Sequence, residues 1–329
     1  MLRVQLIYRD KRSGNYSIEG VFEQVKAGLC DRIQFDDFIW KNDKNRIRSL
    51  LTLLRSGHSI NHITGDVHFL ALGLKGKSTI ITVHDIGHFE RTLKGVKRLV
   101  YKWIWLKWPF EHARYITCVS EFTKRRIVEA IGISPDKIQV IYNPYPRDYT
   151  YTPKAINRSC PVILQIGSGE NKNREGLISA VKGLSCKLIF IGQLSDTHRA
   201  MLEDNGISYD NPTQVEASKM GSYYRQADII YFASRYEGFG LPIIEAHAIG
   251  RPVITSSRAS MPEVAGQGAL FVNPDEVDEI RDAIDCIINE EGVYQRLVEA
   301  GLQNVQRFSL NRIADQYLRL YQSFSNGVA

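Results

Sequence analysis

The segment SRYEGFGLPIIEA (234–246) places two carboxylates, Glu237 and Glu245, eight positions apart around a glycine-rich turn. The residues before it (227–234) are predicted to form a buried parallel strand, and those after it a helix that ends near Gly250. A strand, a glycine turn and a helix start in this order direct unpaired backbone N–H groups and the positive end of a helix dipole to one place. Such a place suits a phosphate or a cluster of sugar hydroxyls.

The elements that must position this segment alternate along the chain. Amphipathic helical stretches, such as residues 17–29 and 45–55, lie between short β-rich runs. These runs cover residues 3–8, 79–84, 115–120, 137–142, 161–167, 187–192, 228–234 and 251–255. The alternation predicts an α/β fold with parallel sheets and helices on both faces.

Length and composition bound the possibilities. A chain of 329 residues with 43% hydrophobic residues is expected to form about two domains of ordinary size. The five cysteines are scattered, which fits a reducing compartment and argues against a disulfide framework or a zinc cluster. The N-terminal residues resemble a first strand rather than a signal peptide, and no apolar run is long enough to span a bilayer. We therefore expect a soluble protein, attached at most to a membrane surface.

A boundary is expected within residues 143–160, which hold three prolines and break the periodicity. The predicted organisation is a first Rossmann-like domain over 1–148 and a linker over 149–160, followed by a second Rossmann-like domain over 161–308. A terminal segment over 309–329 contains a helical pattern that could pack back on the first domain.

The chain resembles retaining GT-B-fold glycosyltransferases of family 4. The resemblance runs in order through SGNYSIEG, TVHDIGHFE, ITCVSEFTKRRI, KIQVIYNP, ILQIGSGENKNREGLISAV and KLIFIGQL, and is richest from Tyr224 to Glu276. It implies a GT-B fold, in which two Rossmann-like parallel-sheet domains face each other across a cleft. The resemblance further implies that residues 1–148 form the acceptor-side domain and residues 161–308 the nucleotide-sugar-binding domain.

The resemblance also implies roles for residues of the glycine-rich turn. Glu237 matches the carboxylate that faces the donor sugar, and Glu245 matches the one that takes the ribose hydroxyls of the nucleotide. The backbone that would contact the sugar and the diphosphate belongs to Gly238, Phe239, Gly240 and Leu241. The structural alternative is a pair of solvated glutamates near a helix start.

Lys172 opens a predicted helix, where a cation is poorly placed for the helix dipole unless an anion binds beside it. It matches the family lysine that holds the diphosphate leaving group; the alternative is a solvated surface lysine. Many family members carry an arginine where this chain has Ser168, from which we expect no more than a hydrogen bond, and Arg174 is nearby but not at that position. Gly14 matches a glycine loop that closes over the diphosphate, although it could equally be an ordinary turn.

His84 ends a predicted strand, at the edge where open α/β sheets bind ligands. The family histidine at this place reaches the donor sugar and the acceptor hydroxyl, and Asp85 beside it could line the acceptor site.

Two histidine pairs with i, i+4 spacing, His84 with His88 and His58 with His62, raise the alternative of a metal site. No third ligand or HExxH pattern accompanies them, and no Asp-x-Asp motif occurs in the chain. We therefore expect no metal and no cofactor apart from the nucleotide-sugar substrate. For His62 and His68 a satisfied core histidine is the preferred interpretation.

The implied reaction moves a sugar from a nucleotide-diphosphate sugar to a hydroxyl with retention of configuration, by front-face attack. A covalent intermediate on Glu237 is an alternative that spacing does not settle. The implied acceptor is a saccharide or a lipid-linked saccharide of a surface polysaccharide, such as an O-antigen or a capsule. Two other functions stay open: a non-catalytic nucleotide-sugar or carbohydrate-binding protein, and a nucleotide-sugar 2-epimerase, whose Ser-Gly-Gly turn is not found here.

Residues 91–126 bear on the acceptor, because they hold ten Lys or Arg but only two acidic residues, with three tryptophans interleaved. One interpretation is contact with an anionic membrane surface, which would give a cytoplasmic protein a peripheral place on the inner face of the membrane. The other is a buried aromatic helix, with Val96, Leu99, Val100 and Trp103 as its core-facing stripe. Nucleic acid is not expected, because no nucleic-acid-binding motif accompanies the charge.

Overall fold

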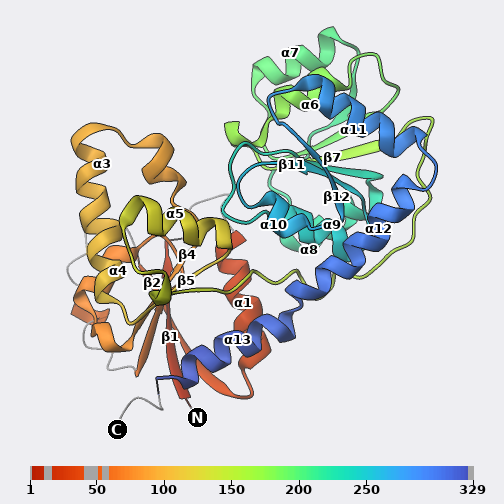
Figure 1. The fold of residues 1–329 in the computed structure, drawn as a ribbon. Coiled ribbons are helices and arrows are strands. Elements are labelled where there is room, and N and C mark those ends of the chain that lie inside the picture. Colours follow the sequence, from red (N-terminus) through yellow and green to blue (C-terminus); the bar gives the residue numbers. More distant parts are fainter. Residues whose placement is uncertain (1, 11–16, 41–50, 54–58, 325–329) are drawn as a thin grey trace. The chain divides into compact units, whose positions relative to one another are not determined.

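The computed structural model describes residues 2–10, 17–40, 51–53 and 59–324, which form two compact units (Figure 1). Unit 1 consists of Met1–Pro144 and Ser309–Ala329, and unit 2 of Tyr145–Phe308. Each unit contains a six-stranded parallel sheet flanked by helices. The predicted α/β class with parallel sheets is therefore confirmed.

Unit 1 has the sheet order β2-β1-β3-β4-β5-β6. Its strands are β1 (Leu2–Arg9), β2 (Ile33–Trp40), β3 (Ile60–Ile63), β4 (Thr79–Val83), β5 (Tyr115–Cys118) and β6 (Ile138–Val140). The strand order reverses at β1, which pairs with β2 on one side and β3 on the other. In open α/β sheets the carboxyl ends of strands at such a switch point are where ligands bind.

Two helices cover one face of this sheet, α1 (Ser17–Leu29) and α13 (Leu310–Gln322) (Figure 1). The buried residues of α13 recur at helical spacing: Leu310, Ile313, Ala314, Tyr317, Leu320 and Tyr321. The two helices approach closely at Gly28, where a Cβ would lie 3.1 Å from the Cβ of Ala314, a tight contact that glycine avoids. The last helix of the chain is thus part of unit 1.

The opposite face packs under shorter helices and α5 (Glu121–Ile131). Alternate residues of β3 and β4 serve the two faces: Ile63 and Ile81 join the cluster under α5, whereas His62 faces α13 through Tyr321. The other helical segments on this side are η1 (His68–Gly73), α3 (Gly95–Tyr101), η4 (Lys102–Lys107) and α4 (Trp108–His112).

Unit 2 has the sheet order β12-β11-β10-β7-β8-β9. The strands are β7 (Val162–Ile166), β8 (Lys187–Ile191), β9 (Ser208–Asp210), β10 (Ile229–Phe232), β11 (Val253–Ser256) and β12 (Ala269–Val272). The helices are α6 (Arg174–Ala180), α7 (Asp196–Asp204), α8 (Ala217–Gln226), α9 (Leu241–Ile249), α10 (Met261–Ala265), α11 (Val277–Asn289) and α12 (Val293–Asn304). This is the doubly wound dinucleotide-binding order, and its switch point lies between the paired strands β7 and β10.

All eight β-rich runs of the sequence form strands, and the predicted helix over 17–29 is α1. Four strands were not predicted: β2, β3, β9 and β12. β2 is interrupted by two aspartates, and β3 and β9 are short and hold polar residues. β12 is a run of four apolar residues, ALFV, that the prediction missed. Most of the helix predicted over 45–55 lies outside the described residues.

The segment expected to be a linker, 149–160, lies within unit 2 and is bonded to it. The Thr152 N–H donates to Ile249 O at 3.1 Å, and Lys154 Nζ lies 2.7 Å from the buried carboxylate of Asp228. Asp228 also accepts hydrogen bonds from the N–H groups of Asn157 and Val162. The division between the units falls earlier than expected, at Pro144 and Tyr145.

The core-facing interpretation of the stripe in α3 and η4 is wrong. Val96 is 76% exposed and Leu99 57%, whereas Val100 and Trp103 are 50% and 40% exposed. The residues that pack inward are their neighbours on the other side of the helix, including Leu106 and Phe110. The sequence pattern did not distinguish the two sides, because both are apolar.

Candidate functional site

The two central strands of unit 2 bring together Lys172 and Glu237, which were predicted from separate motifs. Lys172 follows β7 and Glu237 follows β10, so both lie at the carboxyl edge beside the switch point. The Lys172 Nζ lies 2.6 Å from the Oε1 of Glu237. Both side chains remain partly exposed, at 19% and 17%, so a ligand can reach them.

Neighbouring groups fix the geometry of this ion pair. Asn171 Nδ2 donates to Glu237 Oε1 at 3.0 Å and to Tyr236 O at 2.9 Å. The Lys172 ammonium also lies 4.7 Å from the centroid of the Phe232 ring, within cation–π range. The ammonium is therefore held between a carboxylate and an aromatic face, in surroundings drier than bulk water.

Gly167 is required by the path of the lysine side chain. It follows β7 directly with φ +98°, and a Cβ there would lie 2.7 Å from Lys172 Cε. Only glycine combines this backbone conformation with room for the lysine stem. Ser168, the next residue, is exposed and uncharged.

The nearby Arg174 does not replace the missing family arginine at the surface. Its guanidinium is buried, donating to Gln165 Oε1 at 3.0 Å and to the carbonyl of Gln193 at 2.6 Å. Burial lowers the pKa of Arg174, whereas the nearby Glu175 carboxylate raises it. Arg174 thus joins the loops after β7 and β8 from the inside.

The glycine-rich turn is held by a serine that the sequence analysis gave no role. The buried Ser260 Oγ lies 3.0 Å from Glu237 O and 2.7 Å from Phe239 O. At the end of the turn, Gly240 adopts φ +114° and α9 begins at Leu241. Ser260 lies 23 residues beyond Glu237, so only the folded loop between β11 and α10 reveals this contact.

Glu245 lies one turn into α9, where the buried Tyr224 hydroxyl donates a hydrogen bond to its Oε2. Burial raises the pKa of Glu245 to about 7; the Tyr224 hydrogen bond lowers it and the Asp148 carboxylate raises it. Burial and the same contact with Glu245 also raise the pKa of Tyr224. The carboxyl of Glu245 is thus pre-positioned and close to its protonation point at neutral pH.

In unit 1, His84 follows β4 at the carboxyl edge, and its Nε2 lies 2.9 Å from Thr64 O. Burial lowers the pKa of His84 to about 4, so the ring is neutral at pH 7. Because a carbonyl only accepts, Nε2 carries the proton and Nδ1 is the acceptor nitrogen. Asp85 Oδ1 accepts the Gly87 N–H at 2.7 Å, which shapes the loop beside it.

The same edge of unit 1 carries a charged group that sequence reasoning missed. Arg9, the last residue of β1, lies 3.0 Å from Glu19 and 3.8 Å from Asp66. Asp66 follows β3, so Arg9 and Asp66 come from the two strands at the switch point. Recognising β3 would have revealed this pair. Gly14 lies outside the described residues.

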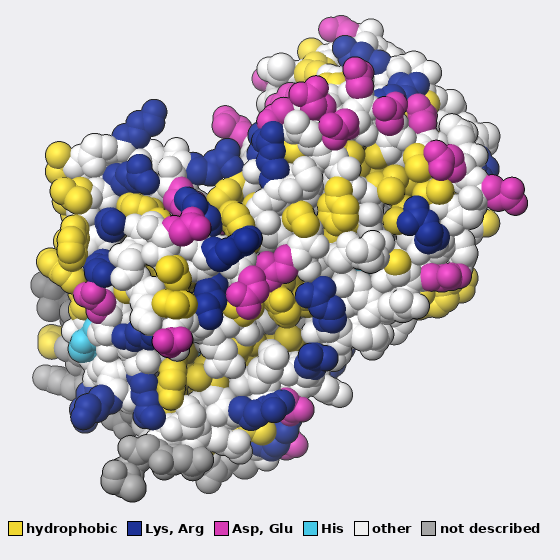
Figure 2. All heavy atoms as spheres, viewed as in Figure 1, with side chains coloured by type: hydrophobic (Ala, Val, Ile, Leu, Met, Phe, Trp, Pro, Cys, Tyr) yellow, Lys and Arg dark blue, Asp and Glu magenta, His cyan; other side chains and the backbone are white. Residues whose placement is uncertain are grey.

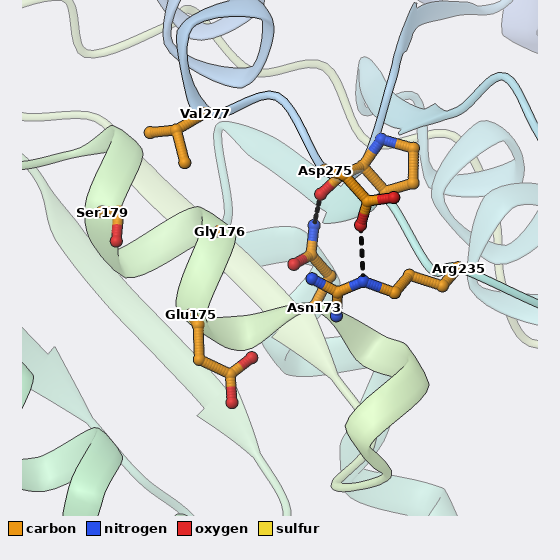
Figure 3. A pocket seen from close by; sticks show the side chains of 8 residues that line it. Asn173, Glu175, Gly176, Ser179, Arg235, Asp275 and Val277 are labelled. Atoms are coloured by element: carbon orange, nitrogen blue, oxygen red, sulfur yellow. Dashed lines mark hydrogen bonds and ion pairs between the residues drawn. The ribbon is translucent and has the colours of Figure 1, made fainter.

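A small pocket of about 190 Å³ opens elsewhere in unit 2, between α6 and the start of α11 (Figure 3). Arg235 Nε lies 2.8 Å from Asp275 Oδ1 there, and the Asn173 amide is bonded to Pro274 O. Arg235 and Asp275 pair with each other, whereas the buried Asn173 Oδ1 has no hydrogen-bond partner among the described residues. Neither Lys172 nor Glu237 lines the pocket. It is a separate surface depression.

Within the part of the chain that the structure describes, no three His, Cys, Asp or Glu side chains are placed to hold a metal. His62 is a satisfied core histidine, as predicted, since its two ring nitrogens lie 2.7 Å from Tyr321 Oη and 2.7 Å from Thr82 Oγ1. His68 is also buried, but its Nδ1 has no hydrogen-bond partner among the described residues.

Both halves of the chain match known families of glycosyltransferases. The family described as Glycosyl transferases group 1 matches residues 152–304, and Glycosyltransferase Family 4 matches residues 37–149. The O-antigen chain mannosyltransferase B of Escherichia coli is 28% identical over 74% of this chain and 70% of its own length. The O-antigen chain mannosyltransferase RfbU of Salmonella typhimurium is 29% identical over 64% of this chain and 61% of its own length.

Solved structures share the fold. HepE of Anabaena, in complex with UDP and glucose, matches 98% of this chain and all of its own with a TM-score of 0.81 at 14% identity. Sucrose-phosphate synthase of Thermosynechococcus elongatus matches 99% of this chain and all of its own with a TM-score of 0.79 at 17% identity. With two such sheets and both family matches, this chain belongs to the GT-B glycosyltransferases of the family 4 type.

Proposed function

We propose that this chain is a retaining, metal-independent glycosyltransferase that moves a sugar from a nucleotide-diphosphate sugar to a hydroxyl of a saccharide or lipid-linked acceptor. The observation that carries the proposal is the Lys172–Glu237 pair, held at 2.6 Å beside the switch point of a dinucleotide-type sheet. The Lys172 ammonium suits a diphosphate, and the Glu237 carboxylate suits sugar hydroxyls.

Several findings support a nucleotide-sugar donor. The structural neighbour HepE binds UDP and glucose. In this chain the start of α9, the Lys172 ammonium and the Glu245 carboxyl together offer partners for a diphosphate and a ribose. The related mannosyltransferases make a mannose nucleotide a natural first donor to test, beside UDP-glucose.

The proposed reaction breaks the bond between the anomeric carbon and the diphosphate oxygen and forms a bond from that carbon to the acceptor oxygen. The proton of the acceptor hydroxyl goes to a diphosphate oxygen on the same face, which preserves the anomeric configuration. Lys172 would neutralise charge that develops on the leaving diphosphate, and the turn from Gly238 to Leu241 would bind it through its backbone. Glu237 would then orient the sugar by accepting its hydroxyls.

We further propose that His84 and Asp85 act on the acceptor side. The neutral His84 ring has an acceptor nitrogen, Nδ1, which suits a hydroxyl better than a phosphate. Metal independence rests on the protein's own cation and on the lack of an Asp-x-Asp motif, and its test is turnover in EDTA.

Assembly of a surface polysaccharide from the cytoplasmic side is the biological role that we propose. The named relatives act on O-antigen chains. The five cysteines are free, as in proteins of a reducing compartment.

The direct test replaces Lys172. We expect Lys172→Met to lower kcat by about 100- to 1,000-fold, because a preorganised charge at the leaving group is lost. Turnover is measured as nucleoside diphosphate released in the presence of acceptor, across a panel of nucleotide sugars. Lys182→Met, at an exposed lysine of the same unit, is the matched control and should leave kcat unchanged.

Unchanged turnover in Lys172→Met would refute the proposed role of the lysine. The exposed, uncharged Ser168 favours one second candidate, a protein that binds nucleotide sugars without turning them over. Thermal stabilisation by nucleoside diphosphates without product from any donor would support that candidate. The anomeric configuration of a product, read by NMR, separates retention from inversion.

A further inference from the structure

The helical run from Gly95 to His112 has two apolar sides, and only one of them is buried. The buried side includes Tyr101 and Trp105, whose rings stack at 5.5 Å, and Trp105 Nε1 donates to Asp66 O at 3.0 Å. The other side is exposed; we call it the apolar stripe, and it consists of Val96, Leu99, Val100, Trp103, Ile104 and Trp108. Core packing of this helix is therefore complete without the stripe.

The stripe is continuous along the helix. Its members follow one another at intervals of three, four or one residue, and each is at least 38% exposed. The π-helical turn η4 keeps Trp103 and Trp108 near each other, with ring centroids 6.0 Å apart. Contiguous exposed apolar side chains of this kind mark an interaction surface.

The charge around the stripe has one sign. Residues 91–108 hold six Lys or Arg and no acidic residue. Within the described residues no ion pair involves Lys94, Lys97 or Lys102, whereas Arg98 lies over the Phe89 ring at 4.7 Å. Figure 2 shows hydrophobic and basic side chains side by side along the edge that α3 occupies in Figure 1.

We propose that the apolar stripe and its lysines dock on an anionic phospholipid surface. The aliphatic and tryptophan side chains would enter the interfacial region, and the ammonium groups would meet lipid phosphates. No described helix is long and apolar enough to cross a bilayer, so the contact would be superficial. Docking would bring the proposed reaction to a lipid-linked acceptor, a consequence that rests on the proposed function.

Two other occupants fit the surface less well. A symmetric contact with a second copy would place the six cations of each chain in a self-complementary patch, where like charges face one another. A nucleic acid would meet the cations but leave Val96, Leu99 and Val100 without partners.

The test is co-sedimentation of the full chain with vesicles of phosphatidylglycerol and phosphatidylcholine, and with vesicles of phosphatidylcholine alone. We expect binding to the anionic vesicles that weakens as salt is added. The triple variant Lys94→Gln/Lys97→Gln/Lys102→Gln should reduce the partition coefficient about 100-fold. The matched control Lys182→Gln/Lys219→Gln/Arg296→Gln removes three exposed cations of unit 2 and should leave partitioning unchanged.

A second variant tests the apolar part. Leu99→Asn/Trp103→Ser should weaken binding at least about 10-fold, whereas Phe271→Ser, at an equally exposed side chain of β12, should not. Absence of vesicle binding at low salt, or equal binding by the two triple variants, would overturn the proposal. So would a dimer that Leu99→Asn/Trp103→Ser dissociates, or DNA binding, in place of vesicle binding. No donor is present, so the outcome is independent of catalysis.

Discussion

At the scale of single residues, Lys172 does not open a helix as predicted: it ends the short η6 (Glu170–Lys172), and α6 begins at Arg174. Its ammonium is instead placed by side chains, with Nζ 2.6 Å from Glu237 and 4.7 Å from the Phe232 ring centroid. The carboxylate thus neutralises the ammonium when no anion is bound. A diphosphate would have to compete with Glu237 for the ammonium, and the released carboxylate would then be available to sugar hydroxyls.

Gly167 offers a test of this arrangement. Gly167→Ala introduces a Cβ 2.7 Å from Lys172 Cε at φ +98°, so it should add the strain of a positive φ and also displace the lysine. Gly183→Ala is the matched control, because Gly183 has φ +73° with no atom within 4 Å of a Cβ. We expect the control to lose about 1 kcal/mol of unfolding free energy and Gly167→Ala about 1–3 kcal/mol more. Urea unfolding measures both.

The affinity for nucleoside diphosphates, compared between Gly167→Ala and Gly183→Ala, distinguishes backbone strain from displacement of the lysine. Gly167→Ala should bind nucleoside diphosphates more weakly than Gly183→Ala, because only the first substitution moves the ammonium. Equal affinities would mean that the lysine stem adjusts without loss, and that Gly167 serves the backbone alone.

At the scale of elements, the sequence revealed eight of the twelve described strands and missed β2, β3, β9 and β12. The runs that became β7 and β10 were visible, so Lys172 and Glu237 could be assigned to one edge in advance. The four-residue β3 was not visible, and with it the switch point of unit 1 and the Arg9–Asp66 pair stayed hidden. Contacts made by folded loops, such as that of Ser260, leave no periodic signal.

The same limit applies to helix faces. A period of 3.6 residues shows that a helix has an apolar side but not which side is buried when both are apolar. In the run from Gly95 to His112 the buried side is set by partners far away in sequence, such as Asp66 O, which accepts from Trp105 at 3.0 Å. The sequence therefore identified residues of the apolar stripe but could not show whether they face the core or the solvent.

The attachment of α13 to unit 1 can be tested through its buried polar contact. Tyr321→Phe removes the hydroxyl that lies 2.7 Å from His62 Nδ1 and leaves a buried nitrogen without its partner. We expect a loss of about 1–3 kcal/mol in the unfolding free energy of unit 1. Tyr151→Phe, at a ring of unit 2 that is 48% exposed, is the control and should change the unfolding free energy of unit 1 by less than about 0.5 kcal/mol. Equal effects would show that the His62 contact adds nothing to helix docking.

At the scale of the whole molecule, the two units differ in their buried titratable groups. In unit 1, burial lowers the pKa of His62 to about 3 and those of His68 and His84 to about 4. In unit 2, burial lowers the pKa of His247 to about 4 but raises that of Glu245 to about 7. The units should therefore respond differently to acid.

Below pH 6.5 the unfolded chain protonates each of these histidines while the folded chain does not, so their contribution to stability falls as pH drops toward 4. His62 and His68 alone would remove about 2.7 kcal/mol per pH unit from unit 1 in that window. The contribution of Glu245 to stability changes with pH in the opposite direction. Its pKa of about 7 in the folded chain lies above the ordinary glutamate value of 4.5, so the folded state takes up the extra proton and unit 2 gains stability as pH falls from 7 to 4.5.

We therefore expect unit 1 to unfold before unit 2 on acidification from pH 6.5 to 4.5. The opposing contributions of His247 and Glu245 should leave the unfolding free energy of unit 2 nearly unchanged. Hydrogen exchange resolved by peptide and corrected for intrinsic rates reports the two units separately. Glu245→Gln keeps an acceptor for Tyr224 but removes the compensating proton uptake, so unit 2 should then lose stability over the same window. Earlier opening of unit 2 in the unaltered chain, or no effect of Glu245→Gln, would contradict this assignment. The buried carboxyl would then be ionised at neutral pH, before any nucleotide reaches it.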